Sequence, residues 1–197
     1  MLDAAVAVFS RRGYHAAGVD EIAEAAGISK PMVYAYLGTK EELFVACLRR
    51  EATRLLQAVL DASAEEAGAS AGEAGASAGE AGVLAEEQLR RGLRAFFGFV
   101  GAHRDGWRVL CRQARGQEPF AAEVAAMRQR MVEAVAVLLA RPAGAHADDI
   151  TPIAHALVGA GEAMADWVVD HPTEDPDVTA GRLMNLMWPG IARVLRP

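Results

Sequence analysis

Apolar residues recur every three or four positions along most of this chain, which is the spacing of one face of an α-helix. Near the N-terminus, Val19, Ile22, Ala23 and Ala26 form such a stripe on a segment barely two turns long. The alternation of apolar and polar residues that is typical of a β-strand appears nowhere in the sequence. We therefore predict an all-α protein.

Residues that start and stop helices divide this N-terminal region further. Gly27 ends the short helix, because glycine adopts the left-handed conformation just past a helix end without strain. Ser29 is placed to cap the next helix, and Thr39 with Glu42 forms a T-x-x-E capping box that opens a longer helix at Lys40. The arrangement predicts a helix-turn-helix, which places one helix in the major groove of DNA.

The second helix of this motif has the spacing of a recognition helix. Val33 and Leu37 are predicted to face inward, which leaves the remaining side chains on the outer surface. Lys30 there is able to donate to guanine O6 or N7, and Met32 and Ala35 are able to contact a thymine methyl. Two alternatives stay open, namely that a tyrosine of this helix packs in the core and that Lys30 is only a solvated lysine.

Three stretches of residues 2–44 resemble the DNA-binding domain of the tetracycline-repressor (TetR) family: LDAAVAVFSRRGY, VDEIAEAAGISKPMVYAYL and TKEELF. The resemblance implies contacts with base edges from the recognition helix and contacts with phosphates from its tyrosines and the following lysine. The candidate DNA-binding residues are Lys30, Pro31, Met32, Tyr34, Ala35, Tyr36 and Lys40.

The sequence departs from the family pattern in two places. Members usually carry a short basic stretch before the first helix, whereas here Leu2 already lies inside that helix. Contacts from such an arm are therefore absent, or the natural start lies upstream. Gly18 stands where a serine or threonine often caps the second helix, so it has no hydroxyl to offer a phosphate.

Charge limits how this segment binds nucleic acid. The chain has a net charge of −6. Its first 50 residues hold six Lys or Arg against six Asp or Glu, so that segment is neutral. Without a positive field, non-specific DNA affinity should be modest, and a few placed groups must hold the phosphates.

We predict a helix-turn-helix DNA-binding domain at 1–46 and a helical ligand-binding and dimerisation domain at 47–197, with about nine helices in the chain of 197 residues. A tandem heptapeptide, GASAGEA, occupies 68–74 and 75–81. It lacks large apolar residues and is rich in glycine, so we interpret 64–82 as a flexible low-complexity insertion, with a frayed helix as the alternative.

Helical spacing and helix breakers predict the remaining elements. The helix from Lys40 should reach about Ala62, and Asp149 should cap a later one that ends near Asp170. Asp175 should cap the last helix, which Pro189 should kink or end early.

Two further sites are expected in the larger domain. A pocket for a small apolar effector is implied by the family, and its candidate lining, which ordinary core packing would also explain, is Phe96, Phe97, Trp107, Cys111, Met127, Met131, Met164 and Trp167. The family also implies a homodimer through its last two long helices, with the candidates Ala156, Gly159, Ala160, Ala163, Leu183, Met184, Met187, Trp188 and Ile191.

The sequence does not support an enzyme, a metal-binding protein or a membrane protein. The loose group His146, Asp148, Asp149 and His155 lacks the histidine spacing of a helical metal site, and no catalytic motif is present, so we expect neither a cofactor nor an enzyme. No membrane span or signal pattern is evident, and the two cysteines suit a reduced cytoplasm.

The sequence thus predicts a ligand-responsive, homodimeric transcriptional regulator in the cytoplasm, most simply a repressor of a palindromic operator. The alternative is a small-molecule or protein-binding module with weak DNA binding.

Overall fold

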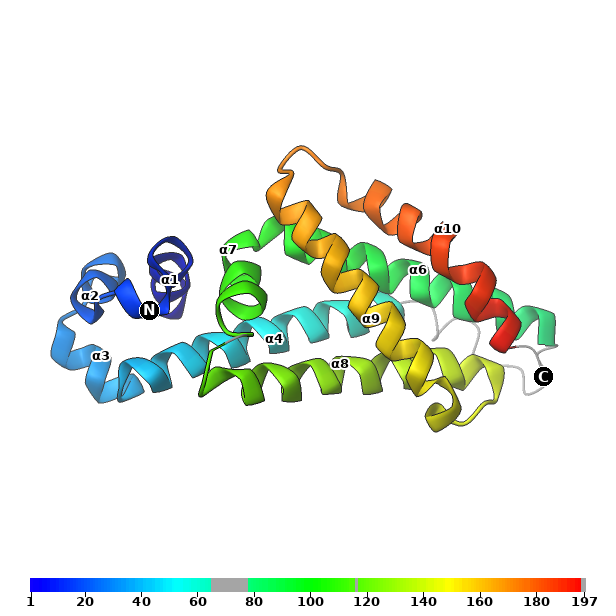
Figure 1. Cartoon of the computed structure of the whole chain (residues 1–197), viewed down its shortest axis with the longest axis horizontal. Helices are drawn as coiled ribbons and strands as arrows, with labels where there is room; N and C mark the ends of the chain where they lie inside the picture. Colours follow the sequence, from blue (N-terminus) through cyan, green and yellow to red (C-terminus); the bar gives the residue numbers. More distant parts are fainter. Residues whose placement is uncertain (65–77, 116, 196–197) are drawn as a thin grey trace. The chain divides into compact units, whose positions relative to one another are not determined.

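The computed structural model of the chain describes residues 1–64, 78–115 and 117–195. Within these ranges the chain forms nine α-helices and one π-helical segment, and no strand occurs among the described residues (Figure 1). The prediction of an all-α fold is confirmed.

The chain divides into two compact units. The first comprises Met1–Arg54 and His103–Arg128, and the second comprises Leu55–Ala102 and Gln129–Pro197. Two long helices, α4 (Lys40–Ala64) and α8 (Phe120–Ala143), contribute to both units. The predicted domain 1–46 lies within the first unit, which also contains a segment from the middle of the chain.

The first unit is built around the N-terminal half of α4. The helices α1 (Leu2–Ala16), α2 (Val19–Ala26) and α3 (Lys30–Leu37) precede it in the chain (Figure 1). From the middle of the chain come α7 (Arg104–Trp107), the π-helical η1 (Arg108–Gln113) and the beginning of α8. The helix α1 packs against α2, α7 and η1, so the middle segment helps to hold the N-terminal helices in place.

The second unit contains α6 (Ala78–Ala102), α9 (Ala147–Asp170) and α10 (Pro176–Val194), together with the later parts of α4 and α8. The helix α6 contacts both α9 and α10, which also contact each other. A core cluster of small and β-branched residues joins α8 to α9: Val132, Ala136, Ala154 and Val158.

Several helix ends differ from the sequence-based expectations. The helix α6 begins at Ala78, inside the predicted insertion 64–82; of that insertion, residues 65–77 lie outside the described residues. The cap of α9 is His146, so Asp149 lies in the first turn and does not cap the helix. The helix α10 continues through Pro189 to Val194, because a proline removes one backbone hydrogen bond without ending a helix held by its neighbours. The predicted cap at Asp175 is confirmed, since its carboxylate accepts a hydrogen bond from the backbone N–H of Asp177 at 2.8 Å.

Candidate nucleic-acid interface

The helix α3 presents one apolar side to the core and the rest of its surface to solvent. Val33 is 2% exposed and Leu37 is half-buried, as the apolar spacing predicts. On the other side, Met32, Tyr34 and Tyr36 are 41%, 45% and 68% exposed. The two tyrosines therefore do not pack in the core, and their hydroxyls are able to reach a ligand in solvent.

The turn before α3 places this helix by backbone geometry. Gly27 adopts a left-handed conformation with φ 66 and ψ 30, and its N–H closes α2. Ser29 occupies the cap position of α3, but its hydroxyl accepts no capping hydrogen bond, contrary to our expectation. The exposed Ser29 hydroxyl thus stays available at a helix N-terminus, where the dipole favours anions.

The predicted capping box at the start of α4 is confirmed. The Thr39 N–H donates to Glu42 Oε2 at 2.7 Å, and the Glu42 N–H donates to Thr39 Oγ1 at 3.1 Å. Hydrogen bonding to the Glu42 carboxylate, first from the Thr39 backbone and then from the Thr39 side chain, holds the pKa of Glu42 below its ordinary value. The box fixes the direction in which α4 leaves α3.

Both lysines of the chain already have partners inside the first unit. Lys30 Nζ lies 2.8 Å from Asp20 Oδ2, and this hydrogen bond raises the pKa of Lys30. Lys40 Nζ donates to the carbonyl of His15 at 3.1 Å and lies 4.9 Å from the centre of the Tyr14 ring. Burial lowers the pKa of Lys40. Neither lysine is therefore unpaired, which agrees with the neutral charge of the first 50 residues.

An aromatic cluster behind the helix-turn-helix includes a residue that sequence reasoning did not assign to it. The rings of Phe9, Tyr14 and Phe44 pack together, and Phe120, at the start of α8, lies 4.5 Å from Phe44 and 4.7 Å from Tyr14 between ring centres. Phe120 is fully buried. The core of the DNA-binding segment thus depends on a residue far along the chain.

Polar contacts reinforce the same arrangement. Gln113 of η1 donates to the carbonyl of Phe9 at 2.8 Å, and Ser10 donates to Asp105 of α7 at 2.7 Å. Arg49 of α4 makes two hydrogen bonds of 2.9 Å with Glu123 of α8. These contacts attach the middle segment of the chain to both α1 and α4.

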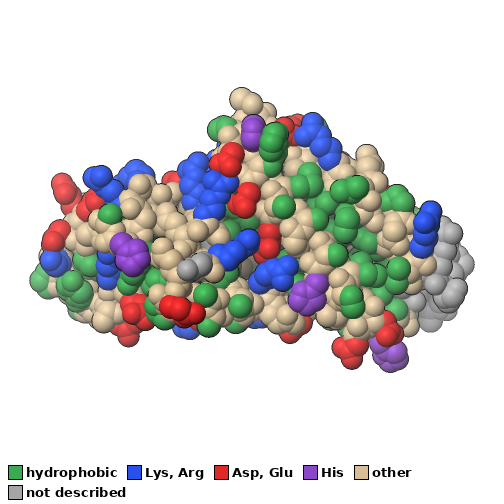
Figure 2. Space-filling view, in the orientation of Figure 1, with side chains coloured by type: hydrophobic (Ala, Val, Ile, Leu, Met, Phe, Trp, Pro, Cys, Tyr) green, Lys and Arg blue, Asp and Glu red, His purple; other side chains and the backbone are tan. Residues whose placement is uncertain are grey.

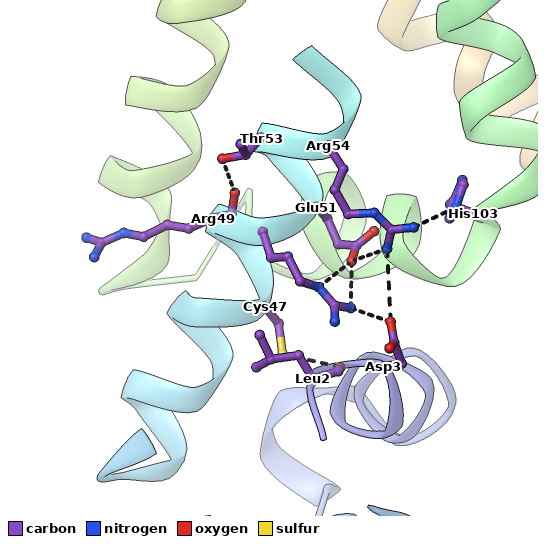
Figure 3. A network of polar contacts seen from close by, with 9 residues as sticks. Leu2, Asp3, Cys47, Arg49, Glu51, Thr53, Arg54 and His103 are labelled. Atoms are coloured by element: carbon purple, nitrogen blue, oxygen red, sulfur yellow. Dashed lines mark hydrogen bonds and ion pairs between the residues drawn. The ribbon is translucent and has the colours of Figure 1, made fainter. Parts of the chain in front are cut away.

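A buried carboxylate lies at the centre of a charged network on α4 (Figure 3). Glu51 is 3% exposed, and its Oε1 accepts hydrogen bonds from Arg50, at 2.8 and 3.0 Å, and from Arg54 at 3.4 Å. Arg50 also pairs with Asp3 of α1 at 2.9 Å, and Arg54 contacts His103 Nε2 at 3.0 Å. Because a guanidinium only donates, His103 is the acceptor in this contact, through Nε2. No local sequence pattern predicts a role for these residues.

The predicted pocket residues fall in both units. Trp107, Cys111 and Met127 are buried in the first. In the second, Phe97 is fully buried, Phe96, Met131 and Met164 are half-buried, and Trp167 is 50% exposed. Trp167 stacks on His171 with ring centres 3.6 Å apart, so it lies at the surface of α9.

The residues predicted for a dimer interface also separate into two groups. Leu183, Met184 and Ile191 of α10 are buried within the chain itself. The others are exposed or half-buried: Ala156, Gly159, Ala160, Ala163, Met187 and Trp188. Figure 2 shows hydrophobic side chains gathered over α9 and α10, where Leu186 is 73% exposed.

Neither a metal site nor a membrane span emerges from the described residues. Among them, no three His, Cys, Asp or Glu side chains are grouped so as to hold a metal ion, and His146, Asp148, Asp149 and His155 form no such group. No helix in the described part of the chain is long and apolar enough to cross a bilayer.

Two family models match the chain. The one described as "Bacterial regulatory proteins, tetR family" matches residues 1–47, and the one described as "Tetracyclin repressor-like, C-terminal domain" matches residues 85–190. The HTH-type transcriptional activator FasR of Mycolicibacterium smegmatis is 31% identical to this chain. The match covers 98% of this chain and 82% of FasR.

Solved structures show the same fold. A TetR-like transcriptional regulator from Rhodococcus sp. RHA1 is 45% identical, with a TM-score of 0.72 over 97% of this chain and 93% of that one. The transcriptional regulator FadR from Bacillus subtilis, solved in complex with stearoyl-CoA, is 16% identical, with a TM-score of 0.72 over 96% of both chains.

Proposed function

The chain belongs to the TetR family and is a DNA-binding transcriptional regulator, and from this premise we propose that it binds a near-palindromic operator as a homodimer. Two copies of α3 would enter the major groove about one helical turn of DNA apart. The observation that carries this proposal is the surface of α3, which buries Val33 and exposes the side chains predicted to contact DNA.

We assign different tasks to the exposed side chains. Lys30, Met32 and Ala35 contact base edges, with Pro31 at the same end of the helix. The hydroxyls of Tyr34 and Tyr36 bind phosphate oxygens, and Lys40 approaches the backbone from the start of α4. Lys40 has donors left after its bond to His15, so it is able to serve both partners.

These tasks separate in a binding experiment that compares DNA upstream of the chain's own gene with random DNA. Lys30→Ala should relax the preference for the operator, because it removes a base contact. Tyr36→Phe should weaken binding to every sequence alike, because it removes a phosphate contact. Arg130→Ala, an exposed residue of α8 in the second unit, is the control and should change neither. Equal affinity of the wild type for both DNAs would contradict the operator proposal.

The dependence of binding on salt tests the alternative function. A regulator that holds several phosphates loses affinity steeply as salt rises. A module that binds mainly small molecules or proteins would bind the operator weakly, with a shallow salt dependence. The pairing of Lys30 with Asp20 is the observation that favours this second candidate.

The homodimer would form through the exposed surface of α9 and α10. Ala156 and Ala163 are small and exposed, which allows the helices of two copies to approach closely. Leu183, Met184 and Ile191 would support this surface from behind, since they are buried within the chain. Ala163→Glu should give monomers in analytical ultracentrifugation and a large loss of operator affinity, whereas dimers that form normally would contradict this assignment.

We propose a long-chain acyl thioester as the effector that releases the DNA. FadR of Bacillus subtilis shares the fold and was solved with stearoyl-CoA. The aromatic and methionine residues of the second unit supply apolar surface suited to such a chain. Switching most of the population between two states requires roughly a 10⁴-fold preference of the ligand for one of them.

Stearoyl-CoA is the probe for this part of the proposal. It should raise the melting temperature of the protein and displace operator DNA, whereas free coenzyme A should do neither. The predicted direction of regulation is repression, so transcription from the operator should rise when the gene is deleted. FasR is named an activator, and a fall in transcription would assign that direction here as well.

A further inference from the structure

Two of the places where the chain passes between its units meet in one hydrogen bond. Arg54 is the last residue of the first unit on α4, and His103 is the first residue of that unit after α6. The Arg54 guanidinium lies 3.0 Å from His103 Nε2. The pair therefore joins the end of the α4 part of the first unit to the start of the middle segment of the same unit.

The pair is one end of the charged network around Glu51. From Arg54 the contacts lead to Glu51 at 3.4 Å, then to Arg50 at 2.8 Å, and then to Asp3 in the first turn of α1 at 2.9 Å. Asp3 and Glu51 balance the two arginines, so the network is neutral as a whole. Removing one charge would leave a buried partner uncompensated.

The backbone of α7 is fitted to the same carboxylate. A Cβ atom on Gly106 would lie 2.6 Å from Glu51 Oε2 and 3.1 Å from its Cδ, so the Glu51 side chain would have to shift to admit it. Gly106 is buried, and α7 therefore approaches α4 as closely as only glycine allows. The position of α7 on α4 and the position of Glu51 are thus fixed together.

We propose that Glu51, with Asp3, Arg50, Arg54 and His103, positions the DNA-binding helices and couples them to the two chain crossings at residues 54 and 103. The network contacts α1 through Asp3 and α7 through Gly106. Because α1 packs against α2, and α2 against α3, the network sets the position of α3. This inference rests on the proposed function, because it assigns residues that do not contact DNA to the control of operator binding.

The test uses the full-length protein and two variants that attack the network at different points. Asp3→Asn removes the pairs that α1 makes with Arg50 and Arg54, and it should fold normally because Asp3 is 84% exposed. Glu51→Gln keeps the shape of the buried side chain and removes its charge. Glu86→Gln is the matched control, because it breaks a carboxylate–arginine pair within one turn of α6.

Each protein is measured for its melting temperature, for its affinity for the operator and for random DNA, and for release from the operator by stearoyl-CoA. Asp3→Asn and Glu51→Gln should lower operator affinity about tenfold, within the range known for residues that couple distant sites. Affinity for random DNA should stay within about twofold, and the control should match the wild type. The factor by which saturating stearoyl-CoA lowers operator affinity should also change in both variants, which a merely structural role would not produce.

Two results would overturn the inference while leaving the proposed function intact. One is that both variants bind operator and random DNA with the wild-type affinities. The other is that affinity for both DNAs falls by the same factor, which indicates general loss of structure. If Glu51→Gln does not fold, Asp3→Asn alone decides between these results. A wild type without operator preference refutes the proposed function, and this inference with it.

Discussion

The polar contacts of the two units are of different kinds. In the first unit many of them join helices that are far apart in the sequence, as between Ser10 and Asp105 or between Arg49 and Glu123. In the second unit they mostly join residues one turn apart on a single helix, as between Arg90 and Glu86 or between Gln129 and Glu133. Apolar packing joins helices of the second unit, as in the cluster of Val132, Ala136, Ala154 and Val158 between α8 and α9.

This difference indicates what each unit has to do. Directional hydrogen bonds fix one geometry, which suits a surface that must match the spacing of a DNA groove. Apolar packing is less directional and tolerates repacking, which suits a region that has to accommodate a ligand. Single substitutions at the interhelical contacts of the first unit should therefore have larger and more specific effects than comparable ones in the second.

The largest effect is expected from Phe120→Ala. It removes a fully buried ring from the cluster with Tyr14 and Phe44, which should lower the free energy of unfolding by about 3–5 kcal/mol. Because the lost ring supports the helix-turn-helix, operator binding should be lost as well. Phe97→Ala, at an equally buried ring of the second unit, should be similarly destabilising. Denaturant unfolding and DNA binding of both variants measure this; equal DNA binding by the two would contradict the difference between the units.

The next largest effect is expected from Gly106→Ala. Its new methyl group would collide with the buried Glu51 carboxylate, so we expect a destabilisation of about 1–3 kcal/mol. Gly98→Ala on α6 is the matched control, because nothing lies within 4 Å of the added atom there. In that helix the same change should stabilise the protein by about 0.5–1 kcal/mol. Thermal unfolding of the two variants should therefore shift in opposite directions, and a shared direction would refute the tight fit at Gly106.

The two caps around α3 provide a smaller test within the first unit. Thr39→Ala breaks the capping box of α4 and should lower stability by about 1 kcal/mol. Ser29→Ala should leave stability nearly unchanged, since the Ser29 hydroxyl makes no capping bond. If Ser29 instead binds a phosphate, its variant should lose operator affinity at constant melting temperature. Melting curves and DNA titrations of both proteins separate stability from binding.

The capping box also has a predictable dependence on pH. The pKa of Glu42 is lowered in the folded protein, so its contribution is complete above the ordinary pKa of a glutamate and is lost as pH falls through the lowered value. The difference in melting temperature between the wild type and Glu42→Gln should therefore shrink between about pH 6 and about pH 3. A difference that stays constant over that range would show that the Glu42 charge plays no part.

The smallest effect on stability is expected from Asp20→Asn, because exposed ion pairs contribute little. Its effect on DNA binding should be clear, since it frees Lys30 and removes a negative charge near the duplex. Random-DNA affinity should rise, and the slope of log K against log salt should steepen by about 0.9. Glu24→Gln, an exposed acid at the other end of α2, is the control. An unchanged slope would mean that the freed charge of Lys30 does not act on the DNA, either at a base edge or at the backbone.

The features of α2, α3 and the start of α4 could be predicted because they depend on residues close together in the sequence. The turn at Gly27, the inward Val33 and the box at Thr39 each follow from short spacings and local backbone preferences. The place of Ser29 could also be predicted, but not the orientation of its hydroxyl, which its surroundings decide.

The contacts behind these helices could not be predicted, because they join residues that no local pattern relates. Nothing in the local sequence distinguishes Phe120 from an apolar residue at the start of any other helix, or Gly106 from any other glycine in a short helix. Their roles depend on which helix lies opposite, and that is a property of the tertiary structure. For the same reason the sequence did not show that α10 continues through Pro189.

The split composition of the first unit has a consequence for protein engineering. A hybrid sensor that joins residues 1–54 to the ligand-binding domain of another protein would lack Phe120, Gln113 and Gly106. These residues complete the core of the first unit. In such a chimaera Tyr14 and Phe44, the aromatic residues that pack against Phe120, would be exposed to solvent. A working exchange has to transfer residues 103–128 as well, so the recipient must be cut at three places along its gene and not at one.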